Sequence, residues 1–171
     1  MPKHLLAIDQ GTTGTTALVV TLEGETLGKK SVELPQHFPK PGWVEHEPEE
    51  VWTSVGAAVG GAIAEAGIDA REVAAIGITN QRETTLLWDR KTGRPIANAI
   101  VWQDRRTSGV CETLKASGAE PAVREKTGSS STRTSPAPRS RGCWITSTGR
   151  APAPRRASSR LAPSTRSWCI A

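Results

Sequence analysis

The sequence predicts an α/β domain with a mixed sheet, followed by a basic tail of different composition. Three short apolar or β-branched stretches joined by turns open the chain, a pattern typical of an antiparallel meander. A long amphipathic stretch with helix-start and helix-stop signals comes next, and further short strands follow it. Strands that continue after a helix in this way indicate an α/β domain whose sheet contains both strand orientations.

The first three strands are expected at residues 4–8, 16–22 and 26–34. The first is an apolar run that ends at Asp9, and the second returns from a turn rich in glycine and threonine. A Glu-Gly pair forms the turn before the third strand, which alternates only roughly between apolar and polar residues.

A helix is expected from Pro48 to about Ala66. Proline suits the first helical position, and the two glutamates that follow it suit the positive end of the helix dipole. Gly67 then provides a stop signal. The apolar stripe of this helix should consist of Val51, Val55, Val59 and Ile63. Three later strands are expected at 73–78, 85–89 and 98–102, and a second helix is expected at 105–115.

Length and composition exclude several classes of protein. The 171 residues suffice for one domain with its own core, and no stretch approaches the run of about 20 apolar residues that a membrane helix needs. The first residues lack the long apolar segment of a secretory signal. Three cysteines without paired spacing argue against a disulfide framework or a zinc site. We therefore expect a cytoplasmic protein without a membrane partner.

The net charge of +5 comes from the tail alone. Residues 128–171 hold eight arginines, no lysine and no acidic residue, whereas residues 1–127 carry 14 basic and 17 acidic groups. Most tail residues are Ser, Thr, Pro, Gly, Arg or Ala, which cannot bury enough apolar surface to offset the entropy lost on ordering. We therefore expect two parts, a folded domain over 1–127 and a disordered tail over 128–171.

The stretch DQGTTGTT at residues 9–16 is a candidate phosphate-binding turn. Glycine lets the backbone approach a ligand closely, and successive backbone N–H groups and threonine hydroxyls can converge on an anion. Asp9, at the mouth of the turn, could hold Mg²⁺ directly or through water. An ordinary hairpin turn uses the same residue types, so the pattern alone leaves both interpretations open. The stretch is not a Walker loop, because it lacks GxxxxGK[ST].

This segment resembles the first phosphate loop of the actin and sugar kinase superfamily, in which the motif D-x-G-T-T lies between two strands. Two further segments closely resemble the glycerol kinases of the carbohydrate kinase family: PKPGWVEHEPEEVW at 39–52 and IGITNQRETTLLWDRKTGRPIANAIVWQDRRT at 76–107. The stretch ITNQRETT is the most specific of these matches. The resemblance covers residues 4 to about 127, and it implies an incomplete actin-like ATPase (ribonuclease H-like) domain.

Arg82 and Glu83 are a candidate pair for binding vicinal hydroxyl groups. A carboxylate accepts a hydrogen bond from one hydroxyl, and a guanidinium donates to another. Neighbours on a regular strand face opposite sides, so the pair can share a pocket only if the chain turns there. A solvated surface ion pair is the alternative, but the glycerol kinases use the matching residues to hold glycerol. Trp102 matches an aromatic residue that packs against the carbon chain of the substrate in the family. The alternative is that Trp102 is a buried core residue.

The resemblance implies ATP-dependent phosphorylation of glycerol to sn-glycerol 3-phosphate, with a similar small polyol as the other possible substrate. Thr12, Thr13 and Gly14 would contact the phosphates of ATP, and Asp9 would support Mg²⁺. Many glycerol kinases carry arginine where this chain has Thr16, which has no charge. The general base, the adenine site and the second phosphate loop lie beyond the resemblance. No catalytic residue is therefore expected on this chain, and we expect it to be inactive alone.

Two other functions stay open at this point. One is a non-catalytic fragment that binds a polyol or a nucleotide. The other is a nucleic-acid-binding protein with a basic arm, although the tail lacks lysine and regularly interleaved aromatic residues. We hypothesise instead that the tail is family sequence translated out of frame, because shifted codons of 128–171 permit a reading that resembles the continuation of the family. Sequencing the DNA around codons 127–129 tests this hypothesis.

The short resemblance also predicts incomplete packing. Family folds complete this sheet and its covering helices with later chain, so some apolar faces should lie uncovered here. An exposed apolar patch or an open sheet edge promotes aggregation. We therefore expect a marginally stable or insoluble product.

Overall fold

A computed structural model describes residues 3–127 and 165–169. The chain divides into two compact units. Unit 1 consists of Met1–Gln36 and Glu47–Gln81, and unit 2 consists of His37–His46 and Arg82–Ala171. The sheet and long helix that the sequence predicts belong to unit 1.

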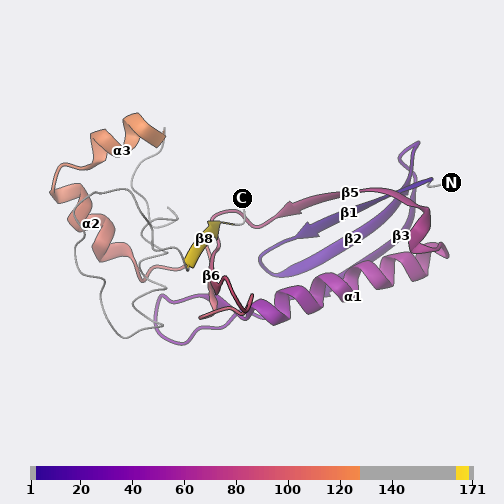
Figure 1. Ribbon diagram of the computed structural model, residues 1–171, viewed down its shortest axis with the longest axis horizontal. Coiled ribbons are helices and arrows are strands. Elements are labelled where there is room, and N and C mark those ends of the chain that lie inside the picture. Colours follow the sequence, from indigo (N-terminus) through magenta and orange to yellow (C-terminus); the bar gives the residue numbers. More distant parts are fainter. Residues whose placement is uncertain (1–2, 128–164, 170–171) are drawn as a thin grey trace. The chain divides into compact units, whose positions relative to one another are not determined.

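Unit 1 contains a four-stranded mixed sheet in the order β3-β2-β1-β5 (Figure 1). The first three strands form the expected antiparallel meander: β1 (His4–Gln10), β2 (Gly14–Thr21) and β3 (Thr26–Glu33). The fourth, β5 (Val73–Asn80), follows the helix and lies parallel to β1. The predicted α/β architecture with a mixed sheet is confirmed.

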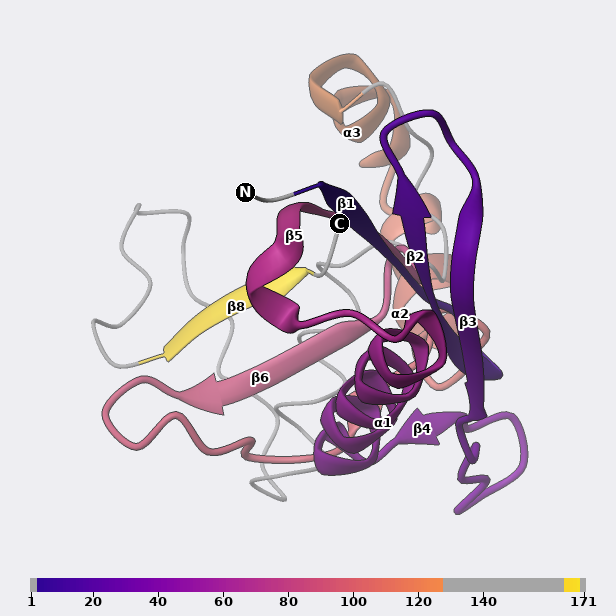
Figure 2. The ribbon, with the colours of Figure 1, turned by 90° about the vertical axis from the view of Figure 1, so that its right-hand side faces the viewer.

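The long helix, α1 (Pro48–Ala66), begins and ends where the sequence predicts. Pro48 occupies the start of the helix, and two glutamates lie in its first turn. Gly67 ends it in the left-handed conformation with a φ of 66°, which glycine adopts without strain. The helix lies along one face of the sheet, over β2 and β3 (Figure 2). A short 3-10 helix, η1 (Ala70–Glu72), leads into β5.

The buried side of α1 differs from the predicted stripe. Its buried residues are Ser54, Ala58 and Ala62. The predicted stripe residues are only partly buried: Val51, Val55, Val59 and Ile63. Small residues face the sheet because α1 lies very close to β3, where a Cβ on Gly28 would lie 2.6 Å from the backbone nitrogen of Ala66.

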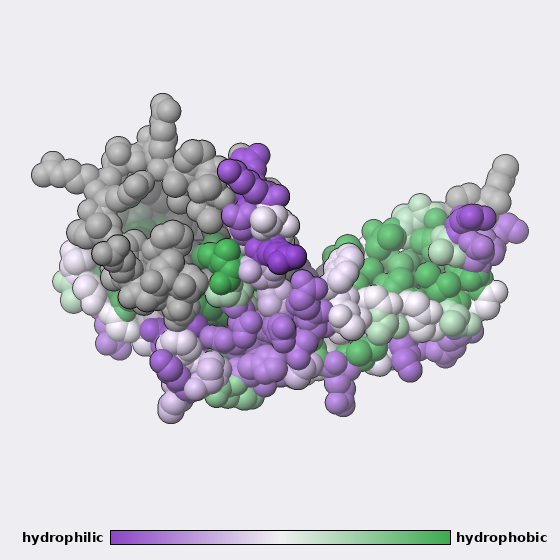
Figure 3. Space-filling model, turned by 60° about the horizontal axis from the view of Figure 1, so that its bottom comes forward, coloured by the Kyte–Doolittle hydropathy of each residue, from purple (hydrophilic) through white to green (hydrophobic). Residues whose placement is uncertain are grey.

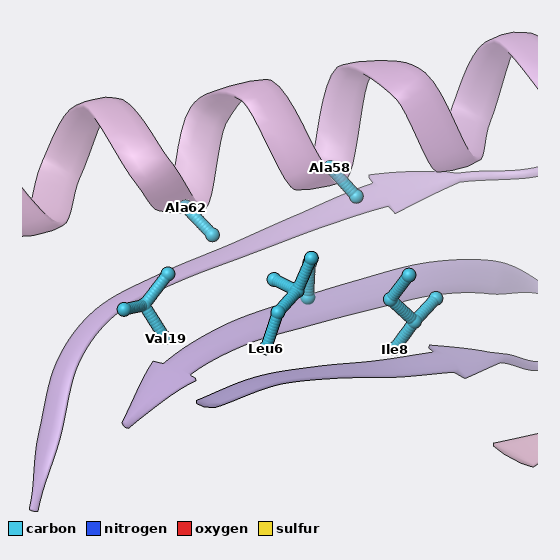
Figure 4. Packing of buried hydrophobic residues seen from close by; sticks show 6 residues of the cluster. Leu6, Ile8, Val19, Ala58 and Ala62 are labelled. Atoms are coloured by element: carbon cyan, nitrogen blue, oxygen red, sulfur yellow. The ribbon is translucent and has the colours of Figure 1, made fainter. Parts of the chain in front are cut away.

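The core of unit 1 lies between α1 and the sheet. Leu6 and Ile8 of β1, Val19 of β2, and Ala58 and Ala62 of α1 point toward one another in Figure 4. All five are buried. Because this core holds β1 and β2 together up to their connecting turn, it fixes the position of the candidate phosphate turn.

The sheet face that α1 covers continues onto β5, where it is exposed. Ile76 pairs in register with Leu6, and Ile78 pairs with Ile8, yet Ile76 is 59% and Ile78 is 70% exposed. Figure 3 shows apolar surface on unit 1. Within the described residues β5 is also an edge strand, so unpaired backbone groups adjoin these isoleucines. The incompletely covered sheet agrees with the sequence-based expectation, while the low solubility of the product stays a prediction.

Unit 2 contains a second four-stranded sheet in the order β4-β7-β6-β8. Its strands are β4 (Glu45–His46), β6 (Thr85–Asp89), β7 (Ala99–Ile100) and β8 (Thr165–Cys169). β6 has the predicted bounds, and β7 is shorter than the strand predicted at 98–102. Two helices follow β7 in the chain, α2 (Ser108–Ala116) and α3 (Glu120–Thr127).

The start of α2 lies three residues after the predicted start at residue 105. The Asp104 carboxylate accepts a hydrogen bond from the backbone N–H of Arg106 at 2.8 Å. Side chains of this type compete with the helix for backbone groups. The residues before Ser108 therefore form turns instead of a first helical turn.

β8 lies in the tail for which the sequence predicts disorder. Its five residues form a strand that pairs antiparallel with β6, and the disorder expected for the tail as a whole stays a prediction. Residues 128–164, with most of the tail that we hypothesise to be out of frame, lie outside the described residues. In the part of the chain that is described, no helix combines the length and the apolar character needed to cross a membrane.

Asp89 closes a tight turn after β6. One oxygen of its carboxylate accepts hydrogen bonds from the backbone N–H groups of Lys91 and Thr92, at 3.0 and 2.8 Å, and from the Thr92 hydroxyl at 3.0 Å. These bonds, and the one from the Thr92 backbone above all, hold the pKa of the Asp89 carboxyl below its usual value.

We expect Asp89 to stabilise unit 2 at neutral pH and to lose this contribution in acid. A carboxyl group with a lowered pKa in the folded chain stabilises the fold above its unfolded pKa of about 3.9, and the contribution disappears as the pH falls through the folded pKa. Asp89→Asn should therefore lower the melting temperature at neutral pH and have little effect in strong acid, where both side chains are neutral. An NMR titration that places the pKa of Asp89 above about 3.9 would contradict this expectation.

Candidate functional site

The candidate phosphate turn connects β1 to β2 at the carboxyl end of β1. The Gly11 N–H donates to the carbonyl oxygen of Gly14 at 2.8 Å, which closes a tight turn around Thr12 and Thr13. Thr13 is exposed, and Thr12 and Gly14 are half-buried. The structure thus brings the three predicted phosphate ligands together in one turn and leaves one of the threonines accessible.

Hydrogen bonds to β3 and α1 anchor the ends of this turn. The carbonyl oxygen of Thr13 accepts from the N–H of Leu34 at 2.9 Å. The Thr15 and Ser54 hydroxyls lie 2.8 Å apart, and Ser54 donates its proton to the carbonyl oxygen of Val51 at 2.8 Å. Because a hydroxyl has one proton to donate, Thr15 must be the donor to Ser54. Both residues are buried, so the beginning of β2 is tied to the helix.

Gly14 is required by the close approach of the turn to β3. A Cβ at this position would lie 2.8 Å from the carbonyl oxygen of Val32. Since that oxygen belongs to the backbone, it cannot rotate away, and any larger residue would displace the turn. The glycine that the sequence suggested for close ligand approach therefore also has a packing role.

Asp9 lies beside the turn on the sheet face opposite the helix. Strand register pairs it with Thr16 on β2 and with Thr79 on β5, so the three side chains project from one face. A carboxylate and two hydroxyls offer the oxygen ligands that Mg²⁺ prefers. The Thr16 hydroxyl lies 2.9 Å from that of Ser31, so an uncharged hydroxyl pair lies next to Asp9 in the sheet.

Two buried amide side chains that the sequence analysis did not identify hold the turn to β5. The Gln10 side chain donates to the carbonyl oxygen of Gly11 at 2.8 Å, and the Gln81 side chain donates to the Gln10 side-chain oxygen at 3.3 Å. The Gln81 backbone N–H also donates to the Gln10 carbonyl oxygen at 2.8 Å. The pairing depends on the register of two strands that are far apart in sequence, so no local signal could have identified it.

A cavity of about 330 Å³ opens beside the turn in unit 1. Its lining residues are Thr13, Gly14, Thr15, Thr16, Ser31, Val32 and Glu33. The lining includes threonine and serine hydroxyls and backbone groups, and such groups can donate hydrogen bonds to an anion. The carboxylate of Glu33 would repel a phosphate group unless a cation lay between the two.

An adjoining groove of about 370 Å³ has a different character. Its lining includes four glutamates, Glu33, Glu47, Glu49 and Glu50. A groove with this many carboxylates does not suit a phosphate group. The hydroxyl-lined cavity beside the turn is therefore the better candidate for an anion site in unit 1.

Arg82 and Glu83 lie in the turn between β5 and β6. The chain thus turns where a shared pocket requires it to, and both side chains are exposed. Glu83 has a φ of 64°, and among the described residues no other non-glycine residue has a positive φ. This conformation costs about 1–2 kcal/mol for a residue with a Cβ. Strain of this kind at an exposed charged residue is typical of functional sites.

Trp102 lies on a turn of unit 2 that is tied to the segment before β4. The N–H of Asp104 donates to the carbonyl oxygen of Val101 at 2.9 Å. The N–H of Val101 in turn donates to the carbonyl oxygen of Val44 at 3.0 Å. Trp102 is 40% exposed, so its indole is not fully buried in the described structure. The exposed part of an indole can supply apolar contact area to a ligand.

The predicted site residues fall into two groups, one on each unit. Unit 1 carries the phosphate and metal candidates, Asp9, Thr12, Thr13 and Gly14. Unit 2 carries the polyol candidates, Arg82, Glu83 and Trp102. That both groups serve a single ligand cavity stays a prediction.

The sequence matches the N-terminal domain of the FGGY family of carbohydrate kinases over residues 4–149. It is 57% identical over 124 residues to the glycerol kinase of Bradyrhizobium diazoefficiens, which covers 72% of this chain and 25% of that protein. It is also 57% identical over 128 residues to the glycerol kinase of Methylobacterium nodulans, which covers 75% of this chain and 26% of that protein. The chain thus spans about a quarter of the length of these curated relatives.

Solved structures have the same fold. The crystal structure of Plasmodium falciparum glycerol kinase with ADP matches with a TM-score of 0.74 and 31% identity, over 85% of this chain and 29% of that chain. Xylulose kinase from Rhodospirillum rubrum matches with a TM-score of 0.75 and 24% identity, over 85% of this chain and 29% of that chain; this second likeness concerns the fold alone. The expected partial sugar kinase fold is confirmed.

Proposed function

Because the chain belongs to the FGGY family of carbohydrate kinases, we propose that it carries the polyol-binding residues and the first phosphate-binding turn of an ATP-dependent glycerol kinase. The proposed reaction transfers the γ-phosphoryl group of MgATP to a terminal hydroxyl of glycerol and gives sn-glycerol 3-phosphate. The two glycerol kinases that are 57% identical to this chain support glycerol as the substrate. The nucleotide named for the Plasmodium falciparum structure supports an adenine nucleotide as the phosphoryl donor.

In this proposal the phosphate turn binds the nucleotide. Thr12, Thr13 and Gly14 contact phosphate oxygens through hydroxyl and backbone N–H groups. The hydroxyl-lined cavity beside the turn supports this role. Asp9 contributes a carboxylate to Mg²⁺, and the cation supplies charge neutralisation, which is most of what phosphoryl transfer requires from a protein site besides positioning. The same positive charge would offset the carboxylate of Glu33.

Glu83 carries the polyol part of the proposal. Glu83 has a φ of 64°, and its exposed carboxylate lies next in the chain to the exposed guanidinium of Arg82, so burial of its side chain does not offset the backbone strain. In this position the carboxylate can accept a hydrogen bond from one hydroxyl of glycerol while Arg82 donates to the next. Trp102 then packs against the carbon chain.

We propose that these residues bind and orient the substrates without accepting the proton of the attacking hydroxyl. Kinases position that hydroxyl against a carboxylate that receives its proton, and we assign this group to residues outside those that match the family here. The chain by itself should then bind ligands without turnover.

Glycerol binding tests the proposed substrate. We expect Glu83→Gln to weaken glycerol binding at least about tenfold, because a charge-assisted hydrogen bond contributes about 1.5–3 kcal/mol. Titration calorimetry on the full chain measures the affinity. Glu112→Gln, which changes an exposed glutamate on α2, is the matched control and should bind glycerol as the parent chain does.

The result that would contradict the substrate is a parent chain that melts cooperatively and yet gives no heat with glycerol. A parallel titration with ADP tests the phosphate turn separately. Thr13→Val removes the exposed hydroxyl of that turn, so it should weaken ADP binding and leave glycerol binding unchanged. Equal loss of both ligands would indicate unfolding instead of a local effect.

A further inference from the structure

Unit 2 contains a buried network of three charged side chains, Glu45, Asp104 and Arg106, and the last two follow Trp102 closely in the sequence. The Asp104 and Arg106 side chains are 1% and 4% exposed, and that of Glu45 is 15% exposed. The Arg106 Nη2 donates to Asp104 at 2.8 Å and to Glu45 at 2.7 Å, and its Nε lies 3.0 Å from both Asp104 oxygens. Paired bonds between a guanidinium and a carboxylate fix geometry as well as supplying energy.

An aromatic ring and an amide complete the network. The Arg106 guanidinium carbon lies 3.8 Å from the centre of the Trp43 ring, close enough for a cation–π contact. The Asn98 side chain donates to the second oxygen of Glu45 at 3.1 Å. The network therefore joins the segment around β4 to the segment from β7 to Arg106, although Glu45 and Arg106 are 61 positions apart.

The same network ties the backbone on both sides of Trp102. The Val44 N–H donates to the Asp104 carboxylate at 2.7 Å, and the Val44 carbonyl oxygen accepts from the Val101 N–H at 3.0 Å. A further bond, from the Asp104 N–H to the Val101 carbonyl oxygen at 2.9 Å, closes the turn. Both ends of the turn that carries Trp102 are thus held to one residue of the other segment.

We propose that Asp104 and Arg106 are positioning residues that set the direction of Trp102. Trp102 is 40% exposed, and the backbone on both sides of it is held by the network, so the network can set the direction in which the indole leaves the turn. Asp104 fixes that backbone through Val44, and Arg106 fixes the carboxylate of Asp104. The role of Trp102 as a wall of the polyol site rests on the proposed function, but its positioning by the network does not require a ligand.

Fluorine NMR of the full chain labelled with 5-fluorotryptophan tests the positioning. Trp102→Phe assigns the signal of Trp102. In Asp104→Ala, which removes the acceptor for both Val44 and Arg106, we expect the Trp102 signal to move toward that of free 5-fluorotryptophan. The signal of Trp88, on β6 of the same unit, should stay in place. Asp104→Asn keeps an acceptor oxygen and should show a smaller displacement.

An unchanged Trp102 signal in Asp104→Ala would overturn the proposal. If the Trp88 signal moves as well, Asp104→Ala has disrupted the whole unit. Arg106→Lys then tests the positioning by the same criterion, which is movement of the Trp102 signal while the Trp88 signal stays in place. Lysine keeps the charge but cannot form the paired bonds to Asp104, so the Trp102 signal alone should move. Joint movement of both signals in Arg106→Lys would assign the network a merely structural role and overturn the positioning.

Glycerol titration separates this proposal from the proposed function. Displacement of Trp102 in Asp104→Asn should weaken glycerol binding by about tenfold, the usual loss for one misplaced apolar contact. A parent chain that fails to bind glycerol, while the Trp102 signal responds as described, would refute the substrate and support the positioning. Unaltered glycerol affinity in a variant whose Trp102 signal has moved would refute Trp102 as a wall of the polyol site.

Discussion

Replacing Gly28 with alanine is expected to destabilise unit 1 by about 3 kcal/mol. The new Cβ would press against the carbonyl oxygen of Ala62 and lie 2.6 Å from the backbone nitrogen of Ala66. Both atoms belong to the backbone of α1, so neither can rotate away as a flexible side chain would. The helix must move off β3, which loosens the core around Ala62. Urea unfolding followed by far-ultraviolet circular dichroism measures the loss.

Gly60→Ala is the matched control for this prediction. A Cβ at Gly60 meets nothing within 4 Å, and alanine favours the interior of a helix by up to about 1 kcal/mol over glycine. The same chemical change should therefore lower the free energy of unfolding at Gly28 and raise it at Gly60. Unfolding of both variants at the urea concentration of the parent chain would refute the close packing of α1 on β3.

Local signals in the sequence predicted where α1 begins and ends, but not which side of it is buried. Proline at the first position and glycine after the last act on the backbone next to them, so the sequence reports them directly. The buried side depends on the distance between α1 and β3, which Gly28 permits and which periodicity does not reveal. Hydrophobicity alone therefore favours the valines as the buried stripe, whereas the smaller side chains of Ala58 and Ala62 fit the narrow space.

The candidate site also combines local features, which the sequence predicts, with contacts between distant positions, which it does not predict. The candidate phosphate turn is local, so its tight geometry at Gly11 follows from residue types in one short stretch. From the sequence, Arg82 and Glu83 can share a pocket only if the chain turns at these residues. The structure has a turn there, in which Glu83 has a positive φ. The contacts that hold these turns in place join distant positions, such as Gln10 with Gln81, which are 71 positions apart. Patterns within one segment cannot encode such pairs.

Replacing Arg106 with methionine should destabilise unit 2 by about 3–5 kcal/mol, the usual cost of removing one partner of a buried ion pair. The carboxylate of Asp104 would lose its counter-charge while 1% exposed, and that of Glu45 while 15% exposed. Methionine fills much of the volume of arginine, so the loss reports on charge and hydrogen bonding more than on a cavity. Urea unfolding followed through the fluorine signal of Trp88 measures it.

Arg105→Met provides the comparison at the neighbouring position. Arg105 is exposed, and its backbone hydrogen bond to the carbonyl oxygen of Gly42 does not involve the side chain. The effect of this variant should stay within about 0.5 kcal/mol, as is usual for exposed residues. Equal stability of the two methionine variants would show that the guanidinium of Arg106 is not paired in the folded chain.

A double variant distinguishes an unpaired charge from lost packing. Asp104→Asn in addition to Arg106→Met removes the carboxylate that arginine had neutralised, so it should recover part of the stability that Arg106→Met loses. Recovery means that the cost of the single variant lies in an uncompensated buried charge. Without recovery, the cost would lie in the contact of Arg106 with the Trp43 ring, and the turn that carries Trp102 would then depend on that contact more than on the ion pair.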